Sequence, residues 1–209
     1  ILSSYLVKEA DFIACHNTSF LHKYDIVSEL REGGIFLLNS RWTAEEVNIH
    51  LPAEVKQMLL EKKAKVYTVD ANGIAESLGL GSRISMVLQA AFFKLAEILP
   101  QEEAMIHRKE AAKKSFAKKG DTVVQKNLQA INAGMTQIVH VELDEQKQGV
   151  KSNAVETEFP PFINNVLMPL NAQKGDCLPV STFIDYADGT MPMGTTAYEK
   201  RGIATRIPK

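Results

Sequence analysis

The sequence predicts an α/β fold in which helices cover both faces of a mainly parallel sheet, followed by an irregular tail. Three short apolar segments alternate with helical patterns in the first half of the chain, and strand–helix–strand connections place successive strands in parallel. After residue 158, prolines and glycines become dense enough to exclude long regular elements. We therefore expect a three-layer, Rossmann-like domain with a Pro- and Gly-rich tail.

The three apolar segments are expected to form strands that are covered on both faces. They are Asp11–His16, Gly34–Asn39 and Lys65–Asp70. Each is too short for a buried helix and is rich in β-branched or aromatic residues. Helical spacing predicts helices over 19–31 and 53–63 between them. Gly33 and Gly34 would end the first helix and lead directly into the second strand.

The next part of the chain is predicted to be helical. One run has Ser82 as its N-cap, is ended by Pro100, and carries apolar residues on one face. These residues are Ile84, Val87, Leu88, Ala91, Leu95 and Ile98. Further helical patterns cover 71–78, 101–118 and a stretch from Asp121 to Met135. His140–Leu143 is expected to be a short strand at the edge of the sheet.

Changes in composition and in hydrophobic periodicity divide the chain into three parts. Residues 1–143 form the predicted α/β domain, and 144–158 are polar and without period, as expected of a linker. Residues 159–209 form a small domain that cannot easily bury a core alone. We expect this last part to wrap around other protein.

Charge and composition exclude several classes of protein. The 24 Lys and Arg residues are balanced by 25 Asp and Glu residues, a net charge of −1. This balance argues against a nucleic-acid or anionic-membrane binder. No apolar run approaches the ~18 residues of a membrane span, and no signal peptide is recognisable. Because Ile1 stands where an initiating Met is expected, we expect a piece of a longer protein.

Cysteine and histidine usage predicts no metal centre in this chain. Cys15 and Cys177 are too few for an iron–sulfur cluster or a Cys-rich zinc site. We expect both to be small buried hydrophobic residues, although one disulfide is arithmetically possible, and so few cysteines suit a reducing cytoplasm. The five histidines show no metal-ligand spacing. His16 could be a general base, but no nucleophile or Asp partner accompanies it.

Polar residues at the carboxyl ends of the predicted strands are candidates for a binding site. They are 15–18, 39–42 and 70–72. Open parallel sheets bind ligands at this edge, and a helix start there suits a phosphate or carboxylate. Asn17, Thr18 and Ser40 could equally cap following helices. The residue pattern leaves both interpretations open.

Two other patterns have simple structural explanations. Gly79-Leu80-Gly81-Ser82 suggests a dinucleotide loop, but it follows a helix instead of a strand and lacks a third glycine. The end of one helix and the start of the next explain it. The basic residues in 107–119 could steer an acidic partner or a polyphosphate, although a solvated helix face is the simpler interpretation.

Several segments, in matching order, resemble pyruvate:ferredoxin (flavodoxin) oxidoreductase. They are Ala10–Asn17, Gly33–Ser40 with Trp42, Gly79–Ile84, Gln89–Lys94, Leu178–Ser181, Asp188–Thr190 and Ala197–Ala204. The similarity spans nearly the whole chain. It implies that residues 1–143 are most of a γ-type α/β domain, and that 159–209 are the small connecting domain that follows it.

The resemblance implies a large, oxygen-sensitive, cytoplasmic enzyme that is a homodimer and serves anaerobic electron transport. This family decarboxylates pyruvate oxidatively with coenzyme A, giving acetyl-CoA and CO2. Thiamine diphosphate with Mg carries the carbanion chemistry, and [4Fe–4S] clusters pass electrons to ferredoxin or flavodoxin. The family's thiamine-binding domains, cluster cysteines and Gly-rich opening strand–turn–helix have no counterpart in residues 1–209. We therefore expect the chain alone to be inactive and to contain no cofactor, its partners being the remaining domains of the parent enzyme.

The family's γ-type domain lies over the active site and is associated with coenzyme A. This implies coenzyme A contacts at the strand ends from His16, Asn17, Asn39 and Ser40, with Arg83 as a cation for phosphate. The alternative is a purely structural module for domain packing or dimerisation, without ligand binding. An independent nucleotide-linked dehydrogenase would need a complete glycine fingerprint, which the sequence lacks.

Overall fold

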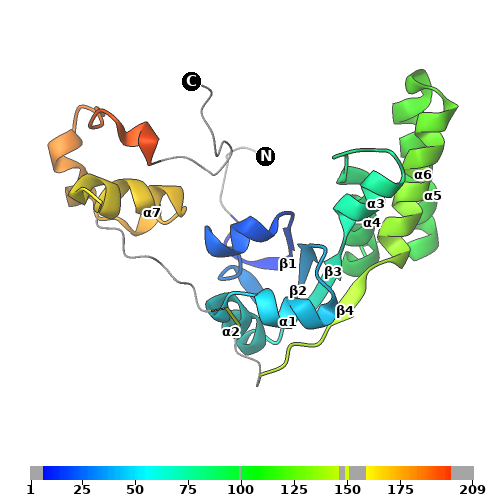
Figure 1. Cartoon of the computed structure of the whole chain (residues 1–209), viewed down its shortest axis with the longest axis horizontal. Coiled ribbons are helices and arrows are strands. Elements are labelled where there is room, and N and C mark those ends of the chain that lie inside the picture. The colour runs from blue at the N-terminus through cyan, green and yellow to red at the C-terminus, as the bar shows by residue number, and fades with distance from the viewer. Residues whose placement is uncertain (1–6, 99, 146–148, 151–158, 199–209) are drawn as a thin grey trace. The chain divides into compact units, whose positions relative to one another are not determined.

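The computed structural model describes residues 7–98, 100–145, 149–150 and 159–198. Contacts within the chain divide it into two units, of which unit 1 comprises 1–22 and 26–152, and unit 2 comprises 23–25 and 153–209. Unit 1 is an α/β domain, and unit 2 is built from short helical segments (Figure 1). Among the described residues, no helix combines the length and hydropathy that crossing a membrane requires.

The described part of unit 1 contains a sheet with the strand order β1-β2-β3-β4. Its strands are β1 (Ala10–Cys15), β2 (Leu30–Asn39), β3 (Lys65–Val69) and β4 (Val139–Val141). β1 pairs with β2 and β2 with β3 in parallel, whereas β4 pairs with β3 antiparallel. The prediction of three parallel strands and a short edge strand is therefore confirmed.

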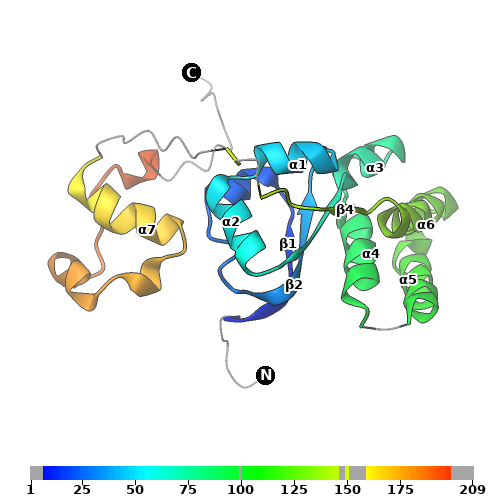
Figure 2. The same ribbon diagram turned by 90° about the horizontal axis from the view of Figure 1, so that it is seen from below.

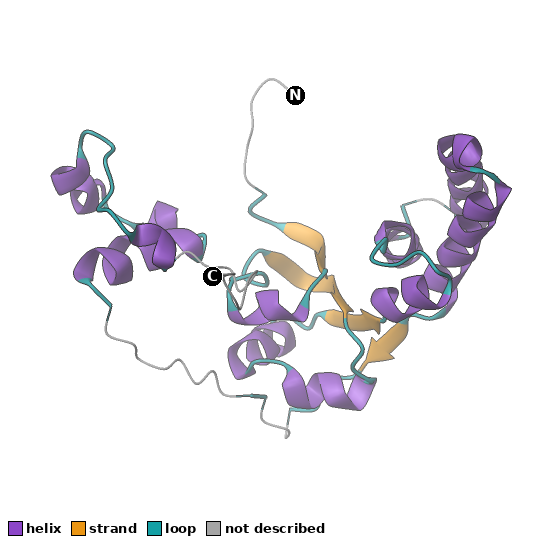
Figure 3. Cartoon of the chain, turned by 45° about the horizontal axis from the view of Figure 1, so that its top comes forward, coloured by secondary structure: helices purple, strands orange, loops and turns teal. Residues whose placement is uncertain are grey.

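Helices cover both faces of this sheet, which confirms the three-layer arrangement (Figures 2 and 3). One face packs against α1 (Ala44–His50) and α2 (Ala53–Glu61), and the other against α3 (Ala71–Ser77), α4 (Ser85–Ala96) and α6 (Asp121–Thr136). α5 (Gln101–Phe116) packs on α4 and α6. Along β2, Phe36 and Leu38 enter the first core and Leu37 enters the second. This alternation is what a strand requires when helices cover both of its faces.

The prediction of a helix over 19–31 is wrong. The structure has only the 3-10 turn η1 (Thr18–His22) there, and β2 already begins at Leu30. Leu21, Val27 and Leu30 are each at most 3% exposed, and all enter the core that α1 and α2 cover. Leu21 and Val27 are six residues apart and would not share one face of a helix, and the three side chains reach the same core from a turn, a loop and a strand. Burial therefore overrides the local helical pattern.

The sequence pattern predicts that Gly33 and Gly34 end a helix. This prediction is wrong, because both glycines lie inside β2. Ala10 pairs with Leu30 but Phe12 pairs with Ile35, so β2 bulges between these two pairs. Gly33 adopts a φ of +72° in this bulge, a conformation that favours glycine. A Cβ on Gly34 would lie 2.7 Å from Leu30 Cδ1. Both glycines are therefore needed for the shape of the bulge.

Lys62, directly after α2, binds the same region of β2 through both its side chain and its backbone. Its Nζ donates to Ser28 O at 2.8 Å and to Leu30 O at 2.5 Å, and its carbonyl accepts from Gly33 N at 2.7 Å. A single residue thus supplies partners for three backbone groups that do not bond within the strand ladder. Lys62 stabilises the bulge and joins it to the end of α2.

The remaining helices agree with the sequence except at some of their ends. The helices predicted over 53–63, 71–78, 101–118 and from Asp121 are present as α2, α3, α5 and α6. α4 has Ile84 and not Ser82 at its N-cap, and it ends before Ile98, which is 60% exposed. α1 was not predicted. It begins with a capping box in which Thr43 Oγ1 accepts from Glu46 N at 3.3 Å and Thr43 N donates to Glu46 Oε2 at 2.8 Å.

Asn48 on α1 fixes the path of the chain after β4. Its Nδ2 donates to Glu142 O at 2.8 Å, and its Oδ1 accepts from Asp144 N at 2.8 Å. The amide therefore pairs with the backbone as a neighbouring strand would. Most of the predicted linker 144–158 lies outside the described residues, but Val150 forms a parallel bridge with Pro52 in the loop between α1 and α2.

Unit 2 is a small helical assembly. It contains a π-helical segment (Ile163–Leu167) that continues into α7 (Met168–Asn171), then 3-10 turns at 175–177, 180–186 and 195–197. Edge-to-face ring pairs join its segments: Phe162 with Tyr186 at 4.7 Å and Phe159 with Tyr198 at 5.4 Å. The described elements are short, as the breaker residues predict.

We expect the substitution Lys62→Met to destabilise unit 1. The side chain keeps its length but loses the charged group that donates to two backbone carbonyls, at a cost of about 1–2 kcal/mol in the free energy of unfolding. Urea denaturation followed by circular dichroism measures this change. Lys63→Met is the matched control, because it removes only the exposed ion pair with Glu32. Equal stabilities of the two variants would contradict the role assigned to Lys62.

Candidate functional site

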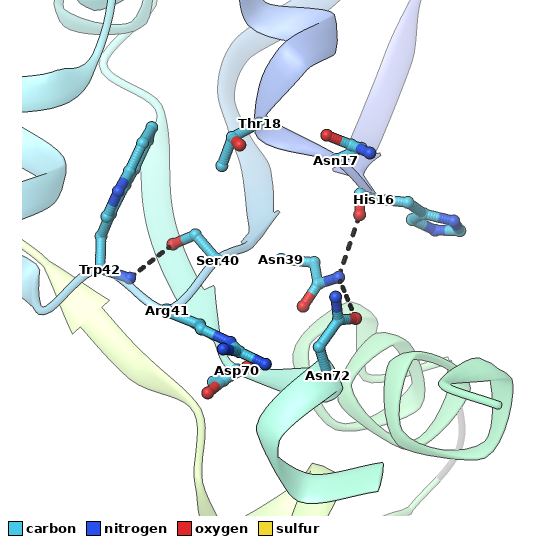
Figure 4. A pocket seen from close by; sticks show the side chains of 9 residues that line it. All are labelled: His16, Asn17, Thr18, Asn39, Ser40, Arg41, Trp42, Asp70 and Asn72. Atoms are coloured by element: carbon cyan, nitrogen blue, oxygen red, sulfur yellow. Dashed lines mark hydrogen bonds between the residues drawn. The ribbon is translucent and has the colours of Figure 1, made fainter. Parts of the chain in front are cut away.

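A polar pocket of about 260 Å³ lies at the carboxyl ends of β1, β2 and β3 (Figure 4). Its walls are formed by the residues that follow these three strands. They are His16, Asn17, Thr18, Asn39, Ser40, Arg41, Trp42, Asp70 and Asn72. Parallel strands bring these segments together because their carboxyl ends meet at one edge of the sheet.

Asn39, at the end of β2, is the central hydrogen-bonding residue of the pocket. Its Nδ2 donates to His16 O at 3.0 Å and to Asn72 Oδ1 at 3.2 Å, and its Oδ1 accepts from Ala71 N at 3.0 Å (Figure 4 draws the first two). The side chain is only 5% exposed. Both amide protons are used within the protein, so Asn39 positions the pocket walls and does not offer a free donor to a ligand.

Ser40 is also committed to internal hydrogen bonds. Its Oγ lies 3.0 Å from Thr68 Oγ1, which in turn donates to Leu38 O at 3.2 Å. Because the single Thr68 proton is used on Leu38, Ser40 must donate to Thr68. Ser40 Oγ also accepts from Trp42 N at 3.3 Å. This hydroxyl has no base beside it and is not arranged as a nucleophile.

The end of β1 supplies both inert and accessible groups. Cys15 is 3% exposed, its Sγ donates to Asn17 O at 3.1 Å, and burial raises the pKa of its thiol to about 11. Asn17 Oδ1 accepts from Ser19 N at 2.9 Å and so caps the following turn, which is one of the two uses left open for it. The His16 ring is exposed and has no hydrogen bond with any described residue, so it remains available to a ligand.

Asp70 and Arg41 complete the rim of the pocket. Asp70 Oδ1 accepts from Gly73 N at 2.7 Å and caps α3, and Arg41 pairs with Glu76 at 2.7 Å. Both are therefore engaged within the protein. Among the described residues that line this pocket, the rings of His16 and Trp42 and the hydroxyl of Thr18 remain accessible to a bound molecule.

A larger, mostly apolar cavity of about 720 Å³ adjoins the polar pocket and shares His16 with it. It lies between β1 and the helices α4 to α6, and its walls are largely aromatic and aliphatic. The lining residues are Phe12, Ala14, His16, Ser82, Arg83, Ile84, Ser85, Leu88, Gln89, Phe92, Phe116 and Asn127. The rings of Phe12 and Phe92 meet edge to face at 5.0 Å in this wall.

The N-terminus of α4 opens at this cavity. No side chain caps its first backbone N–H groups, which are therefore available to an anion. The Arg83 side chain is exposed and makes no hydrogen bond or ion pair with the described residues, and the hydroxyls of Ser82 and Ser85 line the same cavity. These groups together suit a phosphate.

The structure brings four of the five predicted site residues into one pocket. His16, Asn17, Asn39 and Ser40 line the polar pocket, whereas Arg83 lines the adjoining cavity. Sequence reasoning did not single out the apolar wall, whose aromatic rings come from β1, α4 and α5. A hydrophobic residue that lines a cavity looks the same in a sequence as one that fills a core, so no local signal marks these residues.

The described residues do not fit a metal ion or an iron–sulfur cluster. No group of three or more His, Cys, Asp or Glu side chains among them could hold a metal. Cys15 is buried and Cys177 is exposed, so the expectation of two buried cysteines is wrong for Cys177.

The fold and the two cavities define an α/β domain with a polar pocket at the carboxyl edge of a parallel sheet. The family model described as pyruvate ferredoxin/flavodoxin oxidoreductase matches residues 1–137. This chain belongs to that family. A second model, described as a domain of unknown function, matches residues 149–204.

Similar proteins extend well beyond this chain. It is 45% identical over 211 residues to pyruvate:ferredoxin oxidoreductase of Moorella thermoacetica and 42% identical over 210 residues to pyruvate-flavodoxin oxidoreductase of Klebsiella pneumoniae. Each alignment covers 100% of this chain but 18% of the relative. The chain thus spans under a fifth of the length of these relatives.

A solved structure supports the fold independently. The pyruvate oxidoreductase subunit PORC of Thermotoga maritima superposes with a TM-score of 0.50 at 22% sequence identity. The superposition covers 65% of this chain and 67% of that chain. At this identity the likeness concerns the fold alone.

We expect Asn39→Leu to lower the stability of unit 1 by about 1–3 kcal/mol, because the buried Ala71 N–H and the His16 carbonyl lose their partner. Asn72→Ala is the matched control, since it removes only one of the three hydrogen bonds from an exposed position. Urea denaturation of both variants measures the difference. An Asn39→Leu variant as stable as Asn72→Ala would show that the amide does not hold the strand ends together.

We expect the two cysteines to differ in reactivity. Because burial raises the pKa of the Cys15 thiol to about 11, this residue stays protonated and enclosed at about pH 8, whereas Cys177 is exposed to a reagent. Ellman's reagent should label one thiol quickly in the native protein and a second only after denaturation. Cys177→Ser should remove the fast phase. Two fast thiols in the native protein would contradict the burial of Cys15.

Proposed function

We propose that this chain is part of an enzyme that oxidises pyruvate with coenzyme A to acetyl-CoA and CO2 and transfers the electrons to ferredoxin or flavodoxin. In this proposal the chain has no catalytic residues of its own. Unit 1 contributes contacts to coenzyme A, and both units contribute to packing against the remaining domains. Membership of the family and the names of the relatives support pyruvate as the substrate and ferredoxin or flavodoxin as the electron acceptor.

One observation carries the coenzyme A assignment: an uncapped helix N-terminus and an unpaired arginine lie at an apolar cavity. Coenzyme A combines phosphate groups with an adenine ring and a long pantetheine arm. The N–H groups of α4, Arg83 and the two serine hydroxyls suit the phosphates. The aromatic walls suit the less polar parts of the molecule. The charge and the apolar surface therefore lie together, as this ligand requires.

The strand-end residues have distinct roles in this proposal. His16 lines both cavities and can donate or accept a hydrogen bond through its free ring nitrogens. Asn17 lies at the rim of the polar pocket, whereas Asn39 and Ser40 act indirectly. Their internal hydrogen bonds keep the backbone beside His16 and Trp42 in place. They are therefore positioning residues.

The other cofactors belong elsewhere in this proposal. The described residues contain no group of His, Cys, Asp or Glu side chains that could hold an iron–sulfur cluster. We assign the [4Fe–4S] clusters, thiamine diphosphate and Mg to the remaining domains of the longer protein. We further propose a cytoplasmic, homodimeric enzyme in which 1–143 is the γ-type domain and 159–209 the connecting domain. No residue of this chain carries electrons in this scheme.

The exposed apolar side chains of unit 2 favour a second function for the chain, which is the packing of domains without ligand binding. Several large apolar side chains are exposed there instead of lying in its small core. They are Met168, Val180, Ile184, Met191 and Met193. Val180 is 87% exposed and Met193 fully so, which is unusual for side chains of this kind and typical of a surface that other protein covers. This function and coenzyme A binding by unit 1 are compatible.

We expect coenzyme A to bind the 209-residue chain weakly and in a salt-sensitive manner. Isothermal titration at low salt should show affinity that falls about tenfold in Arg83→Gln, because one charge-assisted contact to phosphate is lost. Arg31→Gln is the matched control. Arg31 is similarly exposed, but it pairs with Glu9 and Asp11 and lines neither cavity.

Three results of this titration would contradict parts of the proposal. Equal affinity of the wild type and Arg83→Gln would remove Arg83 from the site. The absence of binding in every variant would contradict the assignment of coenzyme A contacts to this chain, and would favour the structural function of both units. Binding that does not weaken as salt is raised would contradict phosphate recognition.

A further inference from the structure

A third cavity, separate from the polar pocket, lies between α4 and α5 and has a volume of about 380 Å³. Most of its wall is apolar, with a few polar groups at one side. The lining residues are Met86, Gln89, Phe93, His107, Arg108, Ala111, Ala112 and Ser115. A concave, mainly apolar space of this size is within the usual range of small-molecule sites.

Arg108 is the distinctive group of this cavity. Its Nη1 donates to Gln89 O at 3.3 Å and its Nη2 to Gln89 Oε1 at 2.5 Å, and its guanidinium lies over the Phe93 ring at 4.7 Å. All three partners are neutral. Among the described residues, no carboxylate forms an ion pair with Arg108, although on the same unit Arg31 pairs with two carboxylates and Arg41 with one.

Part of the guanidinium is buried without any partner. Arg108 Nε is enclosed and is the only side-chain nitrogen or oxygen of the described residues that is fully buried and lacks a hydrogen bond. Burial also lowers the pKa of Arg108, because the charged form loses contact with water. A half-buried cation without a counter-ion is destabilising, and truncation or an added anion would relieve it.

The charge of the cavity selects the kind of anion. Arg108 carries one positive charge, and the other polar groups, Gln89 and Ser115, are neutral. His107 lies 3.6 Å from Glu103, which offsets its charge when the ring is protonated. A carboxylate brings one negative charge and matches the planar guanidinium with two parallel hydrogen bonds. A phosphate dianion would bring an excess negative charge into a largely apolar space.

We propose that this cavity binds a small monocarboxylic acid with an apolar body, whose carboxylate pairs with the free edge of the Arg108 guanidinium. The apolar body would lie against Met86, Phe93 and Ala112. Because Nε is enclosed, the groups that cover it must move before the carboxylate can reach this atom. Arg83 and His16 do not line this cavity, although Gln89 lines both it and the cavity proposed for coenzyme A.

Benzoate, a planar monocarboxylate with an apolar ring, is the probe for this site. We would titrate it into the 209-residue chain at constant ionic strength and follow the Nε–Hε resonance of Arg108 by NMR. We expect a saturable shift of this signal, and we expect Arg108→Gln to weaken the affinity, measured from the aromatic signals, at least tenfold. Arg31→Gln, on an arginine that already has carboxylate partners, should bind as the wild type does.

A second variant keeps the test decisive if Arg108→Gln does not fold. Ala111→Leu leaves the guanidinium in place but narrows the cavity, so it should abolish benzoate binding while the Arg108 signal persists. A shift that never saturates, or that is equal in wild type and Ala111→Leu, would overturn the proposal. So would inorganic phosphate that binds as tightly as benzoate, because the single charge would then not select the ligand.

Discussion

The side-chain amide of Asn39 is the interaction on which the edge of the sheet depends. It joins the end of β1, the end of β2 and the start of α3 through three hydrogen bonds from one buried group. Parallel strands leave their last backbone groups unpaired at this edge, and a buried group without a partner is destabilising. Asn39 satisfies two of those backbone groups, and the chain turns away from each strand at a fixed point. The polar pocket is the space that remains between these turns.

The two cavities that meet at His16 differ because different elements build them. The polar pocket is made by residues that follow strands, where short polar side chains satisfy the backbone. The apolar cavity is bounded by side chains such as Phe12 and Phe92 that come from a strand and a helix facing each other. Where the two cavities meet, a single bound molecule could contact both polar and apolar walls. A composite site of this kind suits an elongated ligand with charged and apolar parts better than a compact one.

The sequence predicts what depends on local pattern and misses what depends on packing between distant segments. Short apolar runs identify the strands, and the strand ends in turn identify the polar pocket. Leu21 and Val27 enter one core from a 3-10 turn and a loop, so the helix expected over 19–31 does not form. The capping box at Thr43 starts a helix too short to show a clear period. Arg108 is one basic residue among many in the sequence, and only its burial against Phe93 distinguishes it.

The position of β4 has a consequence for the order in which the sheet assembles. The first three strands follow one another closely, so their pairing closes short loops. Thr68 on β3, however, pairs with Val139 on β4, and α3 to α6 all lie between them in the sequence. Loop-closure entropy grows with the length of the chain that must be closed, so this contact is the least favoured early in folding. We therefore expect β4 to pair after the first three strands, and the two hydrogen bonds of Asn48 hold the chain that follows β4 against α1.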